Sequence, residues 1–170
     1  MKFTKREVSG GVGGGAFLKI APGTSVSGVF RGEPFEFWQK WPKGGDKQVF
    51  YDREEAMAAN AKSRFKLNFI TKDDEGKLVA KVWEFGLGAY NELAEINAEY
   101  PLEETVIKIT RKGEGKNTEY TLLPLVRQPL TKKQLAEIDA VELINLAPVD
   151  HEPAGEFASE LESETEETPF

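Results

Sequence analysis

Alternating apolar and polar positions predict β-strands along most of the chain. In SRFKLNFIT, residues 63–71, aromatic and aliphatic side chains alternate with Arg64, Lys66 and Asn68, which is the pattern of a half-buried strand with a basic outer face. The turn sequence DDEGK follows and leads into LVAKVWEF at 78–85, so the two stretches predict a hairpin. Similar spacing predicts further strands at 16–21, 25–32, 34–41, 49–52, 104–112 and 119–125.

The spacing becomes helical at two places. In LGAYNELAEINAEY, residues 87–100, apolar side chains recur every three or four positions until Pro101 stops the helix. A second amphipathic helix is predicted at 131–145, and a helical turn or a long excursion at 53–62. The sequence is therefore mainly β, and strands interrupted by a single helix before the final pair match an OB-type small barrel better than a sandwich or an alternating parallel sheet. We expect an OB-fold-like small five-stranded barrel, with one helix between strands and an added C-terminal helix.

Charge divides the chain into a nearly neutral body and an acidic end. Residues 150–170 carry eight acidic side chains and no lysine or arginine, whereas residues 1–149 carry 22 basic and 21 acidic ones. A like-charged block of this kind cannot bury enough apolar surface to offset the entropy lost on ordering. We therefore expect a flexible glycine-rich lead-in at 1–15, a folded domain at 16–146 and a disordered acidic tail at 147–170.

The composition argues against catalysis. The chain contains no cysteine, which excludes disulfides and thiolate metal sites, and its one histidine, His151, falls in the predicted tail. The carboxylate pairs Asp73-Asp74 and Glu103-Glu104 fall at turns and strand ends, where water solvates them. We therefore expect no enzymatic activity, no cofactor and no metal.

Aromatic and basic residues are interleaved in the predicted β region. The stretch PFEFWQKWPKGGDKQVFYDR, residues 34–53, holds six aromatic side chains, three lysines and an arginine. Single-stranded nucleic acid requires cations for its phosphates and flat rings on which bases stack, at about 1 to 3 kcal/mol per base. A small barrel also fills its interior with rings, so Trp83, which shares a strand face with Lys81, is either a binding platform or a core residue. Alternation assigns to the core Phe37, Phe65, Leu67 and Phe69.

Three stretches resemble bacteriophage single-stranded DNA-binding proteins with an OB fold. They are FLKIAPGTSVSGVFRGEPFEFWQKW, KVWEFGLGAYNEL and GEGKNTEYTLLPL, and the resemblance covers roughly residues 16 to 126. In that family, aromatic and basic residues on the barrel face hold the strand. Together with the interleaved stretch, the resemblance implies a set of DNA-binding candidates: Trp38, Lys40, Trp41, Lys43, Lys47, Tyr51, Arg53, Arg64, Lys66, Lys81, Trp83, Arg111, Lys112 and Tyr120. Some similar phage proteins bind zinc through cysteine pairs, which this chain lacks.

The chain ends in ELESETEETPF, an acidic stretch tipped by an aromatic residue. Replicative single-stranded DNA-binding proteins resemble it in this respect. The resemblance implies that the tail recruits a polymerase, helicase or nuclease, while a role in solubility alone stays open. A disordered polyanion can also occupy the protein's own cationic groove until a strand displaces it. The residues expected to bind partners are Glu164, Glu166, Glu167, Pro169 and Phe170.

We therefore expect a protein that coats single-stranded DNA with little sequence preference in phage replication, recombination or repair. A protein-interaction adaptor and an RNA-binding OB module stay open as alternatives, and the helix at 131–145 allows self-association. A DNA-mimicking inhibitor fits less well, because the acidic residues gather in the tail. No apolar run approaches the roughly 20 residues of a membrane helix, and no secretory signal follows the basic N-terminus. The expected location is the cytoplasm, that of the host cell for a viral protein.

Overall fold

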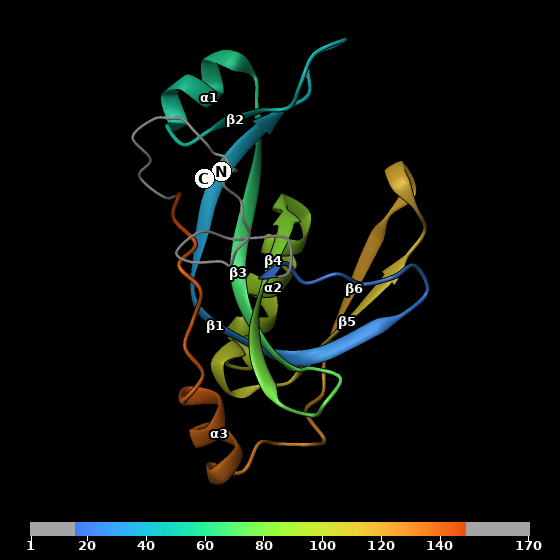
Figure 1. Cartoon of the computed structure of the whole chain (residues 1–170), viewed down its shortest axis with the longest axis vertical. Coiled ribbons are helices and arrows are strands. Elements are labelled where there is room, and N and C mark those ends of the chain that lie inside the picture. Colours follow the sequence, from blue (N-terminus) through green and yellow to red (C-terminus); the bar gives the residue numbers. More distant parts are fainter. Residues whose placement is uncertain (1–15, 149–170) are drawn as a thin grey trace, which may run out of the picture. The chain divides into compact units, whose positions relative to one another are not determined.

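A computed structural model describes residues 16–148, and its elements are mainly strands (Figure 1). Residues Leu18–Leu143 form one compact unit, which holds all of these elements. The strands are β1 (Ser25–Lys40), β2 (Gln48–Phe50), β3 (Lys62–Lys72), β4 (Leu78–Gly86), β5 (Ile107–Lys112) and β6 (Glu119–Pro124). The α-helices are α1 (Arg53–Ala59), α2 (Leu87–Glu99) and α3 (Lys132–Asp139), and the short 3-10 helices are η2 (Leu102–Glu104) and η3 (Gly115–Asn117).

The strands form one antiparallel sheet in the order β4-β3-β1-β5-β6, with β2 paired to the far end of β1. The long strand β1 joins the two halves of this sheet. Its first residues, from Ser25 to Gly28, pair with β5, and its stretch from Val29 to Gln39 pairs with β3. Strand β1 therefore connects two hairpins, β3–β4 and β5–β6, that are separate in the sequence.

A bulge bends β1 where the sequence predicted a turn. Between Arg31 and Phe35 the register shifts, so that β1 uses four positions where β3 uses two. Gly32 lies in this bulge with φ of +85°, a conformation that glycine adopts without steric cost. The prediction of two strands at 25–32 and 34–41 is therefore wrong, because the chain bulges at Gly32 and keeps pairing instead of turning away.

The sheet is not closed into a barrel. Within the described residues no backbone ladder joins β4 to β6, the two strands at the ends of the sheet order. Side chains bridge them instead, since the rings of Trp83 and Tyr120 meet edge to face with centroids 5.5 Å apart. The mainly β prediction is confirmed. The sheet has six strands and is open, so the finer prediction of an OB-fold-like five-stranded barrel stays a prediction.

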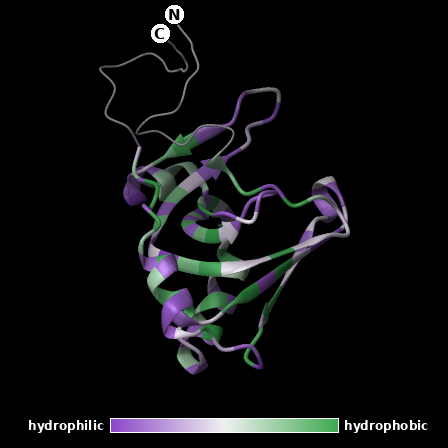
Figure 2. Ribbon diagram, turned by 60° about the horizontal axis from the view of Figure 1, so that its bottom comes forward, coloured by the Kyte–Doolittle hydropathy of each residue, from purple (hydrophilic) through white to green (hydrophobic). Residues whose placement is uncertain are grey.

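One face of β3 and β4, here called the core face, carries most of the buried rings. Cross-strand partners on this face include Phe65 with Phe85 and Leu67 with Trp83. Helix α2 packs on the same cluster through Leu93, and the ring of Tyr90 stacks on Phe65 with centroids 4.2 Å apart. Figure 2 shows the apolar residues as green segments along the strands and helices. This packing accounts for the predicted helix at 87–100, which the structure confirms.

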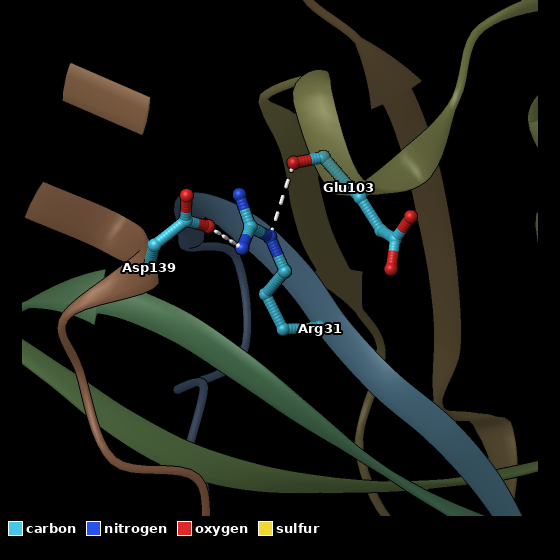
Figure 3. Close-up of polar contacts among 3 residues, drawn as sticks. All are labelled: Arg31, Glu103 and Asp139. Carbon is cyan, nitrogen blue, oxygen red and sulfur yellow. Dashed lines mark hydrogen bonds and ion pairs between the residues drawn. The ribbon is translucent and has the colours of Figure 1, made fainter. Parts of the chain in front are cut away.

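The opposite face of β1, β3 and β4, here called the outer face, carries a smaller core. Val29 and Ile70 are cross-strand partners there, and Ile138 of α3 packs on them. Arg31 ties the end of the helix to the bulge, because its guanidinium contacts the Asp139 carboxylate and donates from Nε to the carbonyl of Glu103 at 3.1 Å (Figure 3).

Helix α3 begins and ends at clear signals. Thr131 and Gln134 form a capping box, each accepting a backbone N–H of the other. The helix ends at Asp139, so the predicted helix at 131–145 is too long. Beyond Asp139 the chain still packs on the outer face through Val141, which explains why apolar spacing continues past the end of the helix.

Other local predictions have mixed outcomes. The hairpin turn at 73–77 is confirmed: the Asp73 N–H donates to the carbonyl of Lys77, and the Asp73 carboxylate accepts two backbone N–H groups. The strand predicted at 16–21 is wrong, since that stretch contributes only isolated backbone contacts such as Leu18 N–H to Val82 carbonyl. The strand predicted at 104–112 begins at Ile107, after the turn of η2.

Candidate functional site

The outer face beyond the bulge gathers rings and cations from three strands and a loop. Phe35 and Phe37 of β1 have Lys66 and Arg64 of β3 as direct cross-strand partners, so the four side chains project from the same face. Tyr51 joins them from the connection between β2 and α1. We call these five residues the aromatic–basic surface.

The three rings of this surface contact one another. Tyr51 lies 6.2 Å from Phe35 and 6.5 Å from Phe37, measured between ring centroids, and Phe35 and Phe37 are 6.5 Å apart. Phe37 is covered, with 2% of its area exposed, whereas Tyr51 is 51% exposed. The buried ring of Phe37 therefore packs against the exposed ring of Tyr51, and a planar ligand can reach the Tyr51 ring.

Pairing of β2 with β1 places Tyr51. Phe50 is the register partner of Trp38, so β2 holds the residue that follows it beside the end of β1. Asp52 then caps α1, its carboxylate accepting the N–H of Glu55 at 2.9 Å. Tyr51 is thus fixed between a strand and a helix cap, although its ring is half exposed.

The amino group of Lys66 lies over a ring rather than in open water. Its Nζ is 5.0 Å from the ring centroid of Phe37, within the range of a cation–π contact. Burial lowers the pKa of Lys66; the carboxylate of Glu84 opposes this shift, and the charge of Lys47 adds to it. A phosphate near Lys66 would favour its charged form.

Glu84 of β4 lies beside the basic side of this surface. One carboxylate oxygen accepts from Arg64 Nη2 and from Gln39 Nε2, both at 3.3 Å. The Tyr51 hydroxyl has a raised pKa, mainly through burial and then through the charge of Glu84. The Glu84 carboxylate therefore bonds Arg64 and also raises the pKa of the Tyr51 hydroxyl.

The loop after β1 extends the site. Trp41 is 71% exposed, and the Nζ of Lys47 lies 5.8 Å from its ring centroid. Lys43 and Arg53 are exposed nearby in the sequence. Lys40 is tied down, because its amino group donates to the carbonyl of Ala59 at 2.5 Å.

Two predicted tryptophans are buried. Trp83 is 3% exposed in the core face, with its ring 4.7 Å from that of Phe85, and Trp38 is 9% exposed. Lys81 is half-buried on the same face as Trp83, opposite Phe69. The register of β3 and β4 thus makes Trp83 a core ring, and neither tryptophan offers an open face for stacking.

Arg111 and Tyr120 are cross-strand partners on β5 and β6, and both line a groove of about 780 Å³ between β4 and β6. Arg64 lines the same groove from the other side. Arg111 is engaged with its own fold: Nη1 donates to the carbonyl of Ile20 at 2.8 Å and Nη2 to the Thr118 hydroxyl at 3.4 Å. Lys112 is exposed at the end of β5.

Sequence reasoning missed part of the site. Phe35 was not among the candidates, and Phe37 was assigned to the core. Phe37 is buried, but on the face opposite Phe65, because its register partner is Arg64. A spacing of two between Phe35 and Phe37 was the available signal, since such residues share a strand face.

The candidate tail residues Glu164, Glu166, Glu167, Pro169 and Phe170 lie outside the described residues. Within residues 16–148, no cluster of three or more metal-binding side chains occurs. None of the helices in that range has the length and apolar character needed to cross a bilayer. No family model, curated protein or solved structure matches the chain.

Proposed function

We propose that this protein binds single-stranded DNA with little sequence preference, through the aromatic–basic surface and the loop at 41–47. The observation that carries the proposal is the half-exposed ring of Tyr51, which packs at a tilt against Phe35 and Phe37 beside Lys66 and Arg64. Bases of any identity have a face that stacks on such a ring, and the adjacent cations neutralise phosphates.

The loop supplies a second stacking position. Trp41 is exposed and Lys47 lies over its ring, so ring and cation again occur together. A strand that passes from Tyr51 to Trp41 would contact one ring and one cation at each place. Lys43 and Arg53, both exposed and each two residues from one of these rings in the sequence, add positive charge to the region.

The order of elements supports an OB-type fold as the finer description. Strands β1, β3 and β4, then helix α2, then β5 and β6 follow the order of a five-stranded Greek-key barrel, which is often partly open. OB folds bind oligonucleotides on their second and third strands and on two loops. The corresponding elements here are β3, β4, the connection at 41–61 and the turn at 113–118.

The biological setting rests on the sequence resemblance. We propose a role in phage DNA replication, recombination or repair in the host-cell cytoplasm, with the acidic end recruiting a polymerase, helicase or nuclease. An adaptor without nucleic-acid affinity is the rival that the binding experiment separates.

A direct test compares charge reversal on and away from the surface. Labelled oligo-dT is titrated with the full-length protein, with K47E/K66E, and with K77E, whose lysine is exposed in the β3–β4 turn. Anisotropy reports affinity, and we expect the double variant to lose most of it while K77E stays close to the parent. Equal losses in both variants, or no binding by the parent at low salt, would refute the proposal.

Two further arms define the ligand. Oligo-U and duplex DNA compete against the labelled strand, and stronger competition by oligo-U would favour the RNA-binding alternative.

Intrinsic fluorescence locates the contact: of the three tryptophans, Trp41 is exposed while Trp38 and Trp83 are buried. We therefore expect quenching by the strand that W41F abolishes.

A further inference from the structure

Glu84 is the carboxylate that meets the cations of the aromatic–basic surface. The register of β3 and β4 places it opposite Lys66, and Arg64 is opposite the next but one residue, Gly86. Its Oε2 accepts from Arg64 Nη2 at 3.3 Å and from Gln39 Nε2 at the same distance. The side chains of Arg64 and Glu84 are 33% and 26% exposed, so their ion pair is accessible from solvent.

The guanidinium of Arg64 is positioned for a ligand by its backbone neighbours. A side chain on Gly86 would place its first carbon 3.3 Å from Arg64 Nη1, so the glycine leaves room for the guanidinium at the edge of β4. Nε of Arg64 is buried without a hydrogen-bond partner among the described residues. The guanidinium therefore bonds through its terminal nitrogens, one of which, Nη2, donates to Glu84.

A carboxylate and a phosphodiester compete for the same donors. Both present two oxygen atoms to the planar fork of a guanidinium. A strand phosphate that reaches Arg64 must displace Glu84 or share the donors with it. While the carboxylate stays, its charge cancels that of Arg64, so a nearby phosphate is not neutralised and keeps its counterion.

We propose that Glu84 is an internal competitor for phosphate at Arg64, and that it limits both the affinity and the salt dependence of strand binding. This inference rests on the proposed function, since it assigns a phosphate subsite within that surface. Gln39 assists by holding the carboxylate in place from β1. The chemical class of the ligand at Arg64 is a phosphodiester of single-stranded nucleic acid.

The test compares E84Q with E92Q in the full-length protein. Glu92 lines the same groove as Arg64 but forms no ion pair with a described residue, so E92Q removes an equal charge without releasing the arginine. Affinity for oligo-dT is measured across a salt series. We expect E84Q to bind several-fold more tightly, with the slope of log K against log salt steeper by about 0.7. E92Q should change the slope little.

A double-mutant cycle with R64M separates local competition from a general charge effect. R64M should cost more affinity in the E84Q background, where the released guanidinium bonds a phosphate, than in the parent, where Glu84 occupies Arg64. An equal cost in both backgrounds would overturn the inference. Thermal melting of each variant checks that it is folded.

The remaining outcomes are also decisive. If the parent binds oligo-dT and E84Q binds equally or more weakly, with an unchanged slope, the competitor role is wrong while the proposed function stands. If neither the parent nor E84Q binds at the lowest salt, the proposed function fails and this inference fails with it.

Discussion

The bulge in β1 divides the outer face into two halves. Both halves are built on the same strands, but different side chains cover them. Before the bulge, Val29 and Ile70 are covered by Ile138 of α3. After the bulge, Phe35 and Phe37 are covered by the half-exposed ring of Tyr51, with Lys66 over Phe37. The first, here called the covered half, is closed by the apolar side of α3, and the second, the open half, has rings and cations at its surface.

One sheet face can thus serve stability in one half and, as proposed, binding in the other. A buried aliphatic pair gains most when an apolar partner excludes water. An exposed ring with an adjacent cation gains little for folding but offers stacking and charge to a ligand. The bulge at Gly32 separates the two, and Arg31 fastens α3 at that point (Figure 3).

The largest expected effect is on the covered half. Replacing Ile138, which is buried between α3 and β1, with alanine removes most of an apolar side chain and should lower the free energy of unfolding by about 2 to 5 kcal/mol. Urea denaturation measures this loss. Oligo-dT affinity, measured where the variant is fully folded, should stay unchanged. A large loss of affinity would show that the two halves are not independent.

The open half should respond in the opposite way. Y51A removes the exposed stacking ring and should cost about 1 to 3 kcal/mol of strand binding, or about 5- to 150-fold in affinity. Its unfolding free energy should change by less than about 1 kcal/mol, because half of the ring is already in water. The matched control is Y100A, another exposed tyrosine, at the end of α2. Equal losses of affinity in both variants would contradict the assignment.

The sequence was sufficient for elements with strong local signals. Phe65, Leu67 and Phe69 alternate with polar residues, and Asp73 forms the turn that follows, so the β3–β4 hairpin could be predicted. Helix α2 has a clear period and ends before Pro101. In these stretches the local pattern and the tertiary packing agree.

Other features depend on pairing between distant segments. Gly32 and Pro34 signal a turn, but the ladder between β1 and β3 continues on both sides of them, and only that ladder distinguishes a bulge from a turn. Trp83 shares a face with Lys81, and its burial follows from its position opposite Leu67. Tyr51 reaches the surface through pairing of a three-residue strand, β2, which has too few positions to show a period.

A smaller effect, with opposite signs for folding and binding, is expected at Lys66. Burial lowers its pKa from the ordinary 10.5, so keeping the amino group charged in the folded state lowers the unfolding free energy. K66M should therefore raise the unfolding free energy slightly at pH 7 while weakening oligo-dT binding and reducing the salt slope by about 0.7.

The pH dependence gives the sign of this cost. In the folded state the pKa of Lys66 is lower than in the unfolded chain, where it is the ordinary 10.5. Below the folded-state pKa, burial of the charged amino group lowers the unfolding free energy by its full amount. This loss disappears as the pH rises toward 10.5, where the unfolded chain also loses the proton. The stability advantage of K66M over the parent should therefore shrink with rising pH in urea titrations. A constant advantage would show that charge burial is not its cause.

The smallest effect tests the fastening between the two halves. D139N removes the carboxylate that contacts Arg31, but Arg31 keeps its bond from Nε to the Glu103 carbonyl, and Asp139 is 63% exposed. Such exposed pairs contribute about 0.2 to 1 kcal/mol, so urea denaturation should register a loss within that range and oligo-dT affinity should not change. A loss larger than that of the Ile138→Ala variant would mean that docking of α3 depends on this ion pair more than on Ile138. The covered half would then be held by charge, as the open half is proposed to hold its ligand.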